Sequence, residues 1–201
     1  MRMGRPTKYG AAAIIAAAAA LVGEAGPDAI TMSAVATRLG APSGSIYHRF
    51  GSRGALRGAV WLDTVTRFHQ QILDLLDEQH PTDSALQAAR ATIEFCRTDA
   101  DRGAVLLAGR AAFTPDDWPA DVLDTVIASD KKFFKKISAV ARRVAEESGT
   151  ERQLVYLAIV DLPYAAVRRH LNAHQPIPAE LADIVADAAA RILTPGHRPA
   201  E

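Results

Sequence analysis

Apolar residues recur at three- and four-residue spacing along most of the chain, which is the pattern of helices that bury one face. The segment near 53–79 shows it clearly, with Val65, Phe68, Ile72 and Leu76 on one face. No alternating apolar and polar run typical of a half-buried strand extends beyond a few residues. Alanine, the best helix former, is abundant. The sequence therefore predicts an all-α fold.

Glycine, proline and capping residues divide this pattern into about nine helices. Gly40 is expected to end the second helix, and Thr31 and Ser52 are placed to cap the second and fourth. Pro81 is expected to stop the fourth helix, and Thr82 to cap the fifth. The expected helices lie near residues 9–25, 32–39, 44–50, 53–79, 83–100, 102–112, 120–148, 151–174 and 179–193.

Charge is unevenly distributed along the 201 residues, although 23 basic and 23 acidic residues make the whole chain neutral. Neutrality at first argues against a nucleic-acid partner, because phosphate binding needs an excess of positive charge. Residues 1–58 hold seven basic and two acidic residues, a net charge of +5, whereas residues 59–201 carry −5. Residues 31–58 contain four arginines and no acid. The basic N-terminal part is therefore the candidate nucleic-acid-binding domain.

Composition excludes several other classes of protein. With 49% apolar and 23% charged residues, the chain is typical of a folded globular protein rather than a disordered one. A single cysteine, Cys96, can form neither an internal disulfide nor a cysteine-rich zinc site. The longest uncharged run near the start, Tyr9–Gly23, is mostly alanine and too short to span a membrane. We therefore expect a cytoplasmic protein with no membrane partner.

The third expected helix carries the chemistry of a DNA-reading element. Two short helices joined by a glycine-containing turn outline a helix-turn-helix. The second of these begins with small polar residues, which can approach phosphates and base edges closely. Ile46 and Phe50, four residues apart, can face the core and so turn the residues between them outward. The candidate DNA contacts are Thr31, Ser43, Gly44, Ser45, Tyr47, His48, Arg49 and Arg53.

Basic residues before the first helix, Arg5 and Lys8, add a candidate arm for the minor groove. A disordered cationic tail with no DNA contact is an equal alternative for these residues. A small three-helix core with a solvated polar helix is the alternative for the whole segment, but it does not explain why residues 31–58 lack acids.

A set of spaced residues also carries a family resemblance. The marks are Gly4-Arg5-Pro6, Gly26, Thr31, Ala36, Gly40, Gly44-Ser45-Ile46-Tyr47-x-x-Phe50, Ser52-Arg53 and Leu56. With these marks residues 4–58 resemble the N-terminal domain of the tetracycline-repressor (TetR) family of bacterial transcription regulators. Two positions depart from the family pattern: Pro42 replaces a small hydroxyl residue and Gly54 replaces an acid.

The resemblance implies a role for each matching residue. It implies that Tyr47 and Thr31 touch phosphates, and that Arg53 anchors the start of the fourth helix on DNA. It implies that the small residues at the start of the third helix, together with His48, approach bases or backbone. It also implies a non-enzymatic regulator, most often a repressor, with a helix-turn-helix domain in residues 1–51 and an effector-binding and dimerisation domain in residues 52–201.

Two such modules are needed to read a palindromic operator with useful specificity, so we expect a homodimer. The last two helices, near 151–174 and 179–193, carry apolar stripes and are the expected interface. The family resemblance points to the same pair. The alternative is that both stripes only close the core of the same chain.

The segment Val155–Tyr164 is the candidate ligand-binding wall of the body. Asp161 is a lone carboxylate in an apolar run, and Pro163 should bend its helix because it lacks an N–H. An Asp161 that pairs with an arginine or faces solvent is the alternative. The candidate ligand contacts are Phe95, Trp118, Tyr156, Asp161 and Tyr164. Thr150 and Gln153 fit a capping box at the start of this helix.

The body shows no catalytic or cofactor-binding motif. Cys96 lies on an apolar helix face and is expected in the core, and His170 and His174 have metal-ligand spacing but no third ligand. We therefore expect a sequence-specific DNA-binding regulator, acting as a ligand-responsive repressor with an unknown small-molecule effector and no cofactor. The alternatives are a regulator without a ligand, or an enzyme with an unrecognised site.

Overall fold

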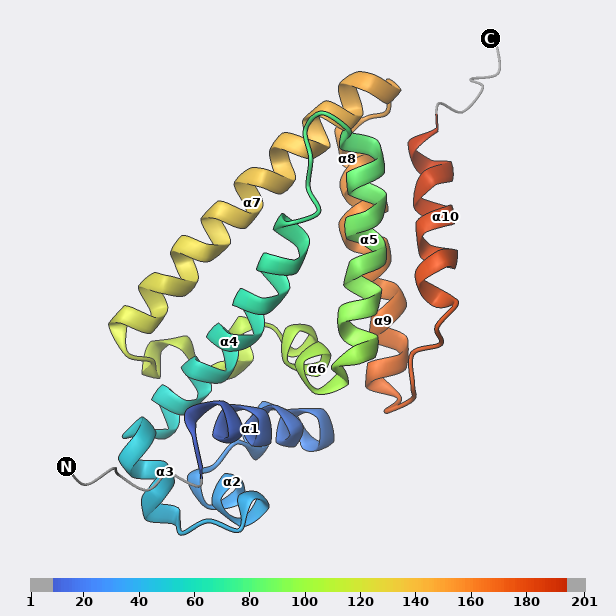
Figure 1. Ribbon diagram of the computed structural model, residues 1–201. Coiled ribbons are helices and arrows are strands. Elements are labelled where there is room, and N and C mark those ends of the chain that lie inside the picture. The colour runs from blue at the N-terminus through green and yellow to red at the C-terminus, as the bar shows by residue number, and fades with distance from the viewer. Residues whose placement is uncertain (1–8, 195–201) are drawn as a thin grey trace, which may run out of the picture.

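The computed structural model describes residues 9–194, and over that range the chain forms nine separate helices with connecting turns and no strand (Figure 1). The all-α prediction is confirmed. The helices are α1 (Ala11–Ala25), α2 (Met32–Leu39), α3 (Ser43–Phe50), α4 (Arg53–Leu73), α5 (Pro81–Thr98), α6 (Ala100–Ala108), α7 (Ala120–Ser148), the continuous α8 (Arg152–Tyr156), η4 (Leu157–Asp161) and α9 (Leu162–Asn172), and α10 (Leu181–Leu193).

The two caps expected in the N-terminal part are confirmed. Thr31 accepts a hydrogen bond from the Ala34 amide at 3.0 Å, and Ser52 accepts one from the Ala55 amide at 3.0 Å. Gly40 ends α2 in the left-handed conformation, with φ of 60°. Each cap satisfies an amide that the first turn of a helix leaves free, so local signals fix where these helices begin and end.

Boundaries in the body differ from the sequence prediction at three places. The fourth helix ends at Leu73 rather than near 79, and Pro81 begins α5 instead of stopping α4. Proline suits the first turn of a helix because no partner is needed there for its missing N–H. The sixth helix spans Ala100–Ala108 and gives way to a short 3-10 turn, η2 (Arg110–Phe113), followed by η3 (Pro115–Asp117).

The capping box expected at Thr150 and Gln153 is not formed. Helix α8 begins at Arg152 without a side-chain cap. The Thr150 hydroxyl instead donates to the carbonyl of Leu193 at 3.4 Å, across to the end of α10. A contact to the neighbouring helix thus replaces the local cap that the sequence pattern favours.

The helical irregularity expected around Pro163 is present. The chain widens into a π-helical turn over Leu157–Asp161, and Pro163 follows in the first turn of α9. Because proline cannot donate to the carbonyl one turn earlier, the preceding turn is free to take an extra residue. Val160 in this turn and Tyr164 in the first turn of α9 both line the cavity described below.

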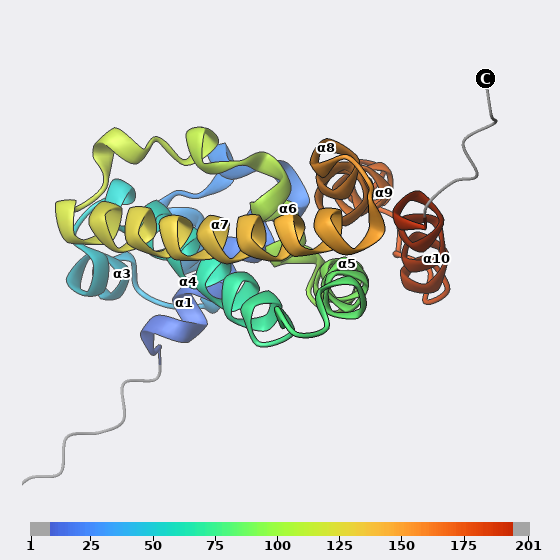
Figure 2. The same cartoon turned by 90° about the horizontal axis from the view of Figure 1, so that it is seen from above.

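Helices α1–α3 gather at one end of the molecule, and α4 runs from them into the body (Figure 1). Viewed from above, α3 and α10 lie at opposite ends (Figure 2). One core joins the two parts, since buried Ile14, Val35 and Ile46 of the first helices belong to the same cluster as Val105 and Phe113 of the body. Helix α4 is therefore packed on both sides of the junction.

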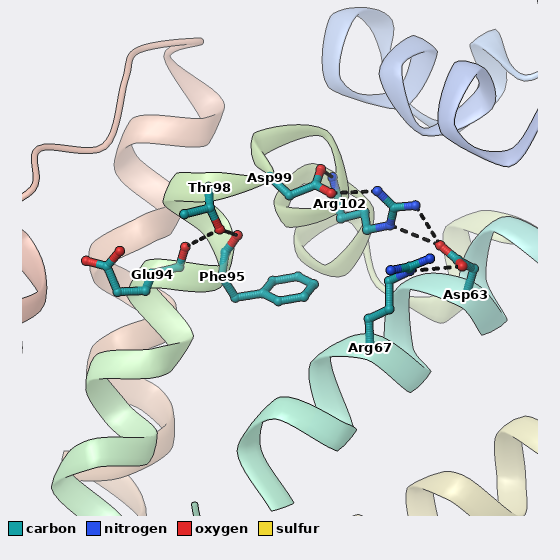
Figure 3. Close-up of polar contacts among 7 residues, drawn as sticks. All are labelled: Asp63, Arg67, Glu94, Phe95, Thr98, Asp99 and Arg102. Atoms are coloured by element: carbon teal, nitrogen blue, oxygen red, sulfur yellow. Dashed lines mark hydrogen bonds and ion pairs between the residues drawn. The ribbon is translucent and has the colours of Figure 1, made fainter. Parts of the chain in front are cut away.

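An arginine fixes α6 against α4 (Figure 3). Arg102 donates through Nε and a terminal nitrogen to one oxygen of Asp63, at 3.0 and 2.8 Å, and through its other terminal nitrogen to Asp99 at 2.5 Å. Arg67 donates to the second oxygen of Asp63 at 3.0 Å. This network holds α6 at the position where it walls the cavity described below.

Gly54, one of the two departures from the family pattern, has a steric reason. A Cβ at this position would lie 2.1 Å from the carbonyl oxygen of Asp117, so only glycine lets α4 approach η3 this closely. We expect Gly54→Ala to lower the free energy of unfolding by about 1–3 kcal/mol, because two backbone segments must move apart. Thermal and urea melts would measure this loss.

Gly44→Ala is the matched control for that substitution. A Cβ at Gly44 meets nothing within 4 Å, so alanine there should be neutral or stabilise by about 0.5–1 kcal/mol. Equal stabilities of the Gly54→Ala variant and the original chain would contradict the steric explanation.

Candidate DNA-binding surface and body cavity

Helix α3 presents the residues that the sequence places in contact with DNA. Ile46 is fully buried and holds the helix against the core. The remaining candidates on this helix are exposed: Ser43, Gly44, Ser45, Tyr47, His48 and Arg49. Pro42 stands at the N-cap and gives no side-chain cap, so the first amides of α3 stay available to an anion. The arrangement suits a helix whose first turn approaches a phosphate or a base edge.

The arginine on α3 is not neutralised by the acids of the same part of the chain. Glu24 pairs with Arg38 at 2.8 Å, and Asp28 pairs with Arg57 at 2.8 Å. Arg49 forms no ion pair within residues 9–194. The positive charge of α3 is therefore left for an external partner.

Arg53 has a structural role in addition to any DNA contact. Its Nε donates to the carbonyl of Ile30 at 2.7 Å, and a terminal nitrogen donates to the carbonyl of Asp28 at 2.8 Å. These bonds fix the start of α4 to the segment before α2, with the side chain 46% exposed. Arg53 thus positions the helix-turn-helix, and its contact with DNA stays a prediction. The predicted arm residues Arg5 and Lys8 lie outside the described residues.

A cavity of about 440 Å³ lies in the body between α4, α5, α6, α7 and the η4–α9 segment. Its volume is that of a small-molecule site, and its wall is mostly apolar. Aromatic rings make up much of that wall: Trp61, Phe68, Phe133, Phe134, Tyr156 and Tyr164. The polar side chains at the wall include His69, Arg110 and Asp130.

These polar groups are held by identifiable partners. Arg110 donates to Asp130 at 3.1 Å, and Nδ1 of His69 lies 2.8 Å from the hydroxyl of Ser129. Burial lowers the pKa of His69 to about 4, so this ring is neutral at physiological pH. Burial also raises the pKa of Asp130, against the opposing effect of Arg110. The polar end of the cavity therefore combines one ion pair with a neutral imidazole.

The predicted ligand contacts divide into two groups. Tyr156 and Tyr164 line the cavity, whereas Phe95, Trp118 and Asp161 are not part of its wall. Asp161 is exposed at the end of the π-helical turn, which agrees with the solvent-facing alternative.

Trp118 and Phe95 are buried elsewhere. Trp118 packs in the core shared with α1–α3 and donates to the Phe113 carbonyl at 2.8 Å. Phe95 lies behind the wall, edge-on to Phe68 with ring centroids 5.3 Å apart.

Sequence reasoning missed the polar end of the cavity. His69 interrupts the apolar face of α4, between Phe68 and Ile72, and a polar residue on a buried face was a usable signal. No sequence signal pointed to Arg110 and Asp130, because these residues are separated in sequence and meet only when η2 packs near α7. Long-range pairs of this kind do not follow from helical periodicity.

Other reactive candidates in the body are structural. Cys96 lines the cavity but is buried, and this burial, with a smaller effect of Asp99, raises its thiol pKa to about 12. It is therefore a protonated, unreactive thiol. Helix α9 ends at Asn172, which leaves His174 beyond the helix that carries His170. Within residues 9–194 no three His, Cys, Asp or Glu side chains are grouped to hold a metal ion.

Exposed apolar side chains mark one further surface, on the last helices. Leu154, Leu157, Val160 and Tyr164 of α8–α9 are each 40–44% exposed, and Ile184 of α10 is 58% exposed. Large apolar groups that cluster in this way on a surface are typical of a protein–protein interface. In the part of the chain that the structure describes, no helix is long and apolar enough to cross a membrane.

Comparison with known proteins agrees with this geometry. Residues 14–60 match the family model described as bacterial regulatory proteins, tetR family. No curated protein sequence matches the chain significantly. Solved structures of TetR regulators share the fold over nearly the whole length of the chain.

Three solved structures show how far the likeness extends. PfmR from Thermus thermophilus has a TM-score of 0.69 and 19% identity, covering 94% of this chain and 95% of its own. A TetR-like regulator from a Rhodococcus species has a TM-score of 0.67 and 17% identity, covering 94% of this chain and 97% of its own. FadR from Bacillus subtilis, in complex with stearoyl-CoA, has a TM-score of 0.61 and 14% identity, covering 89% of this chain and 96% of its own. The chain thus carries the TetR family's N-terminal domain in residues 14–60 and has the fold of solved TetR-family transcriptional regulators over nearly its whole length.

Proposed function

We propose that this regulator is a ligand-responsive repressor that binds a palindromic operator as a homodimer in the bacterial cytoplasm. The observation that carries the proposal is the pairing of two features in one chain. An exposed, cationic α3 provides a surface for DNA, and an apolar cavity in the body provides a site for an effector. The first residues of α4 fall within residues 14–60, which match the TetR family model, and later residues of α4 line the cavity, so one helix connects the two features.

The DNA contacts follow the surface described above. Tyr47, His48 and Arg49 are placed to meet phosphates and base edges, with Ser43, Gly44 and Ser45 in close approach at the start of α3. Thr31 caps α2 and is the expected phosphate contact at the start of that helix. Residues 1–51 act as the reading domain, and the remainder binds the effector and dimerises.

The dimer is proposed to form through α8–α9 and α10. Their exposed apolar residues would be covered by the same residues of a second copy about a two-fold axis. Only a dimer presents two α3 helices to successive major grooves, which a palindrome requires.

Effector binding is supported by the volume and apolar wall of the cavity. A protein of the same fold, FadR from Bacillus subtilis, was solved in complex with stearoyl-CoA. A ligand that favours one spacing of the two α3 helices by about 1–3 kcal/mol would alter operator occupancy about 5- to 150-fold.

Leu157→Glu tests the dimer and the operator binding together. A carboxylate from each copy would be buried in the interface, so we expect the dimer dissociation constant to rise at least about 100-fold. Sedimentation velocity would show monomers. A DNA duplex selected from a random library for binding to the original protein would be bound more weakly, because the monomer presents only one α3 helix. Ala128→Glu, which adds the same charge on the exposed face of α7, should do neither. A dimeric Leu157→Glu protein would place the interface elsewhere.

A further inference from the structure

Several polar atoms at the cavity wall have no hydrogen-bond partner in the described structure, among them Asp130 Oδ1, His69 Nε2 and the buried indole Nε1 of Trp61. Asp130 accepts from Arg110 through one carboxylate oxygen, Oδ2, while its Oδ1 accepts no hydrogen bond within residues 9–194. His69 Nδ1 is satisfied by Ser129, and His69 Nε2 lies 3.9 Å from Asp130 Oδ1, which is too far for a hydrogen bond. A free acceptor and an imidazole nitrogen therefore face the same corner of the cavity.

The charges at this corner cancel. The guanidinium of Arg110 neutralises the carboxylate of Asp130, and the buried imidazole of His69, whose pKa is lowered to about 4, is uncharged at neutral pH. The thiol of Cys96 is protonated as well. A charged ligand would leave water for a site that offers it no net opposite charge, which is costly in an apolar surrounding.

Aromatic rings surround the same corner. Phe133 stacks on His69 with ring centroids 4.0 Å apart, and Phe68 and Phe134 meet Phe133 at 5.9 and 5.5 Å. Ala88 and Gly103 also line the wall, and Gly103 lets α6 pack closely against Cys96 of α5. Such walls favour a flat apolar body that packs against ring faces and edges.

We propose that the cavity binds an uncharged, largely apolar aromatic molecule with one hydrogen-bond donor, which it places on Asp130 Oδ1. This inference rests on the proposed effector role of the cavity and gives that effector its chemical class. Arg110 holds the acceptor in place. With the Ser129 hydroxyl donating to His69 Nδ1, His69 Nε2 carries the hydrogen and donates to the oxygen of a ligand hydroxyl. The remainder of the ligand lies among Phe68, Phe133 and Tyr156.

Three probes with the same apolar body and different polar groups test whether the cavity prefers an uncharged ligand. The probes are 2-naphthol, 2-naphthoate and 2-naphthylmethylammonium, titrated calorimetrically into the full chain at pH 7. The naphthol is uncharged at that pH because phenols ionise near pH 10. We expect the naphthol to bind roughly 10-fold more tightly than either ion. Tighter binding of an ion, or no binding of any probe, would overturn the proposal.

Two substitutions then separate the members of the ion pair. Asp130→Asn leaves Arg110 unbalanced, so the preference should move from naphthol to naphthoate. Arg110→Gln leaves Asp130 unbalanced and should move it to the ammonium. Asp124→Asn, on the exposed face of the same helix, should keep the original order.

Asp130→Asn and Arg110→Gln are informative only as folded proteins. Asn keeps the shape of Asp130 and Gln keeps a shorter, uncharged polar side chain at Arg110, and a thermal melt checks that each variant folds. An order of affinities unchanged in a folded Asp130→Asn and a folded Arg110→Gln protein would refute the assignment.

The effector role can fail separately from the ligand class. If 2-naphthol binds as expected and leaves the affinity for the selected duplex unchanged, the cavity assignment stands and the proposed regulation does not. If the chain neither dimerises nor binds any selected duplex, the proposed function fails whatever the probes show.

Discussion

Replacing Ser45 with glutamate should lower the affinity for a selected operator duplex by roughly 100- to 1000-fold. Ser45 is exposed in the first turn of α3, near Tyr47 and the free amides that follow Pro42. A carboxylate there would lie against phosphates and base edges, and like charges brought together at an interface cost several kcal/mol. Fluorescence anisotropy with the labelled duplex would measure the loss across a series of salt concentrations.

The control for this prediction carries the same charge change elsewhere. Gln87→Glu adds a carboxylate on an exposed face of α5, in the body, and should leave operator affinity within a few-fold of the original. Melting temperatures of both variants should stay close to the original, because neither side chain is buried. Full operator affinity in a folded Ser45→Glu protein would show that α3 is not the reading helix.

The N-terminal part could be predicted from sequence because its signals are local. Thr31 and Ser52 cap the helices that follow them, and each needs only an amide three residues away. Ile46 is the buried residue of α3, so the helix residues on either side of it in the sequence lie on the exposed surface. Such features depend on a few consecutive residues, and the structure reproduces them.

The cavity could be predicted only in part because its polar end is assembled over long distances in the chain. Tyr156 and Tyr164 were found from the irregular helix that carries them. Asp161, one residue beyond the cavity-lining Val160, turns out to solvent, since the π-helical turn decides the direction of each side chain there. The pairing of Arg110 with Asp130 depends on how η2 meets α7, which no periodicity encodes.

Arg57→Met should lower the melting temperature by roughly 5–10 °C and loosen the DNA-binding domain from the body. Arg57 is only 4% exposed and donates to the Pro27 carbonyl at 3.0 Å and to Asp28 at 2.8 Å. It also donates to the hydroxyl of Thr114, between η2 and η3, at 3.4 Å. Methionine keeps much of the side-chain volume and removes all three bonds. The fall in melting temperature therefore measures the loss of the guanidinium's hydrogen bonds and not the creation of a cavity.

Hydrogen exchange would locate the loosening. Amides of α2 and α3 should exchange faster in Arg57→Met, while those of α5 and α10 should be nearly unchanged. Arg67→Met removes an exposed arginine from the same helix and should change neither exchange nor stability appreciably, since exposed ion pairs contribute little. Uniformly faster exchange throughout the chain would point to general destabilisation and not to a local link.

The same residue is placed to carry a signal from the cavity to the DNA-binding domain. Arg110, whose partner Asp130 lines the cavity, lies in η2 four residues before Thr114, and Thr114 is held by Arg57. A ligand that shifts the Arg110–Asp130 pair would move η2, and Arg57 would pass that movement to Pro27 and Asp28 ahead of α2. Any factor by which 2-naphthol changes operator affinity should therefore fall towards one in Arg57→Met and persist in Arg67→Met. An undiminished factor in a folded Arg57→Met protein would mean that the coupling runs along α4 or α6 without this arginine.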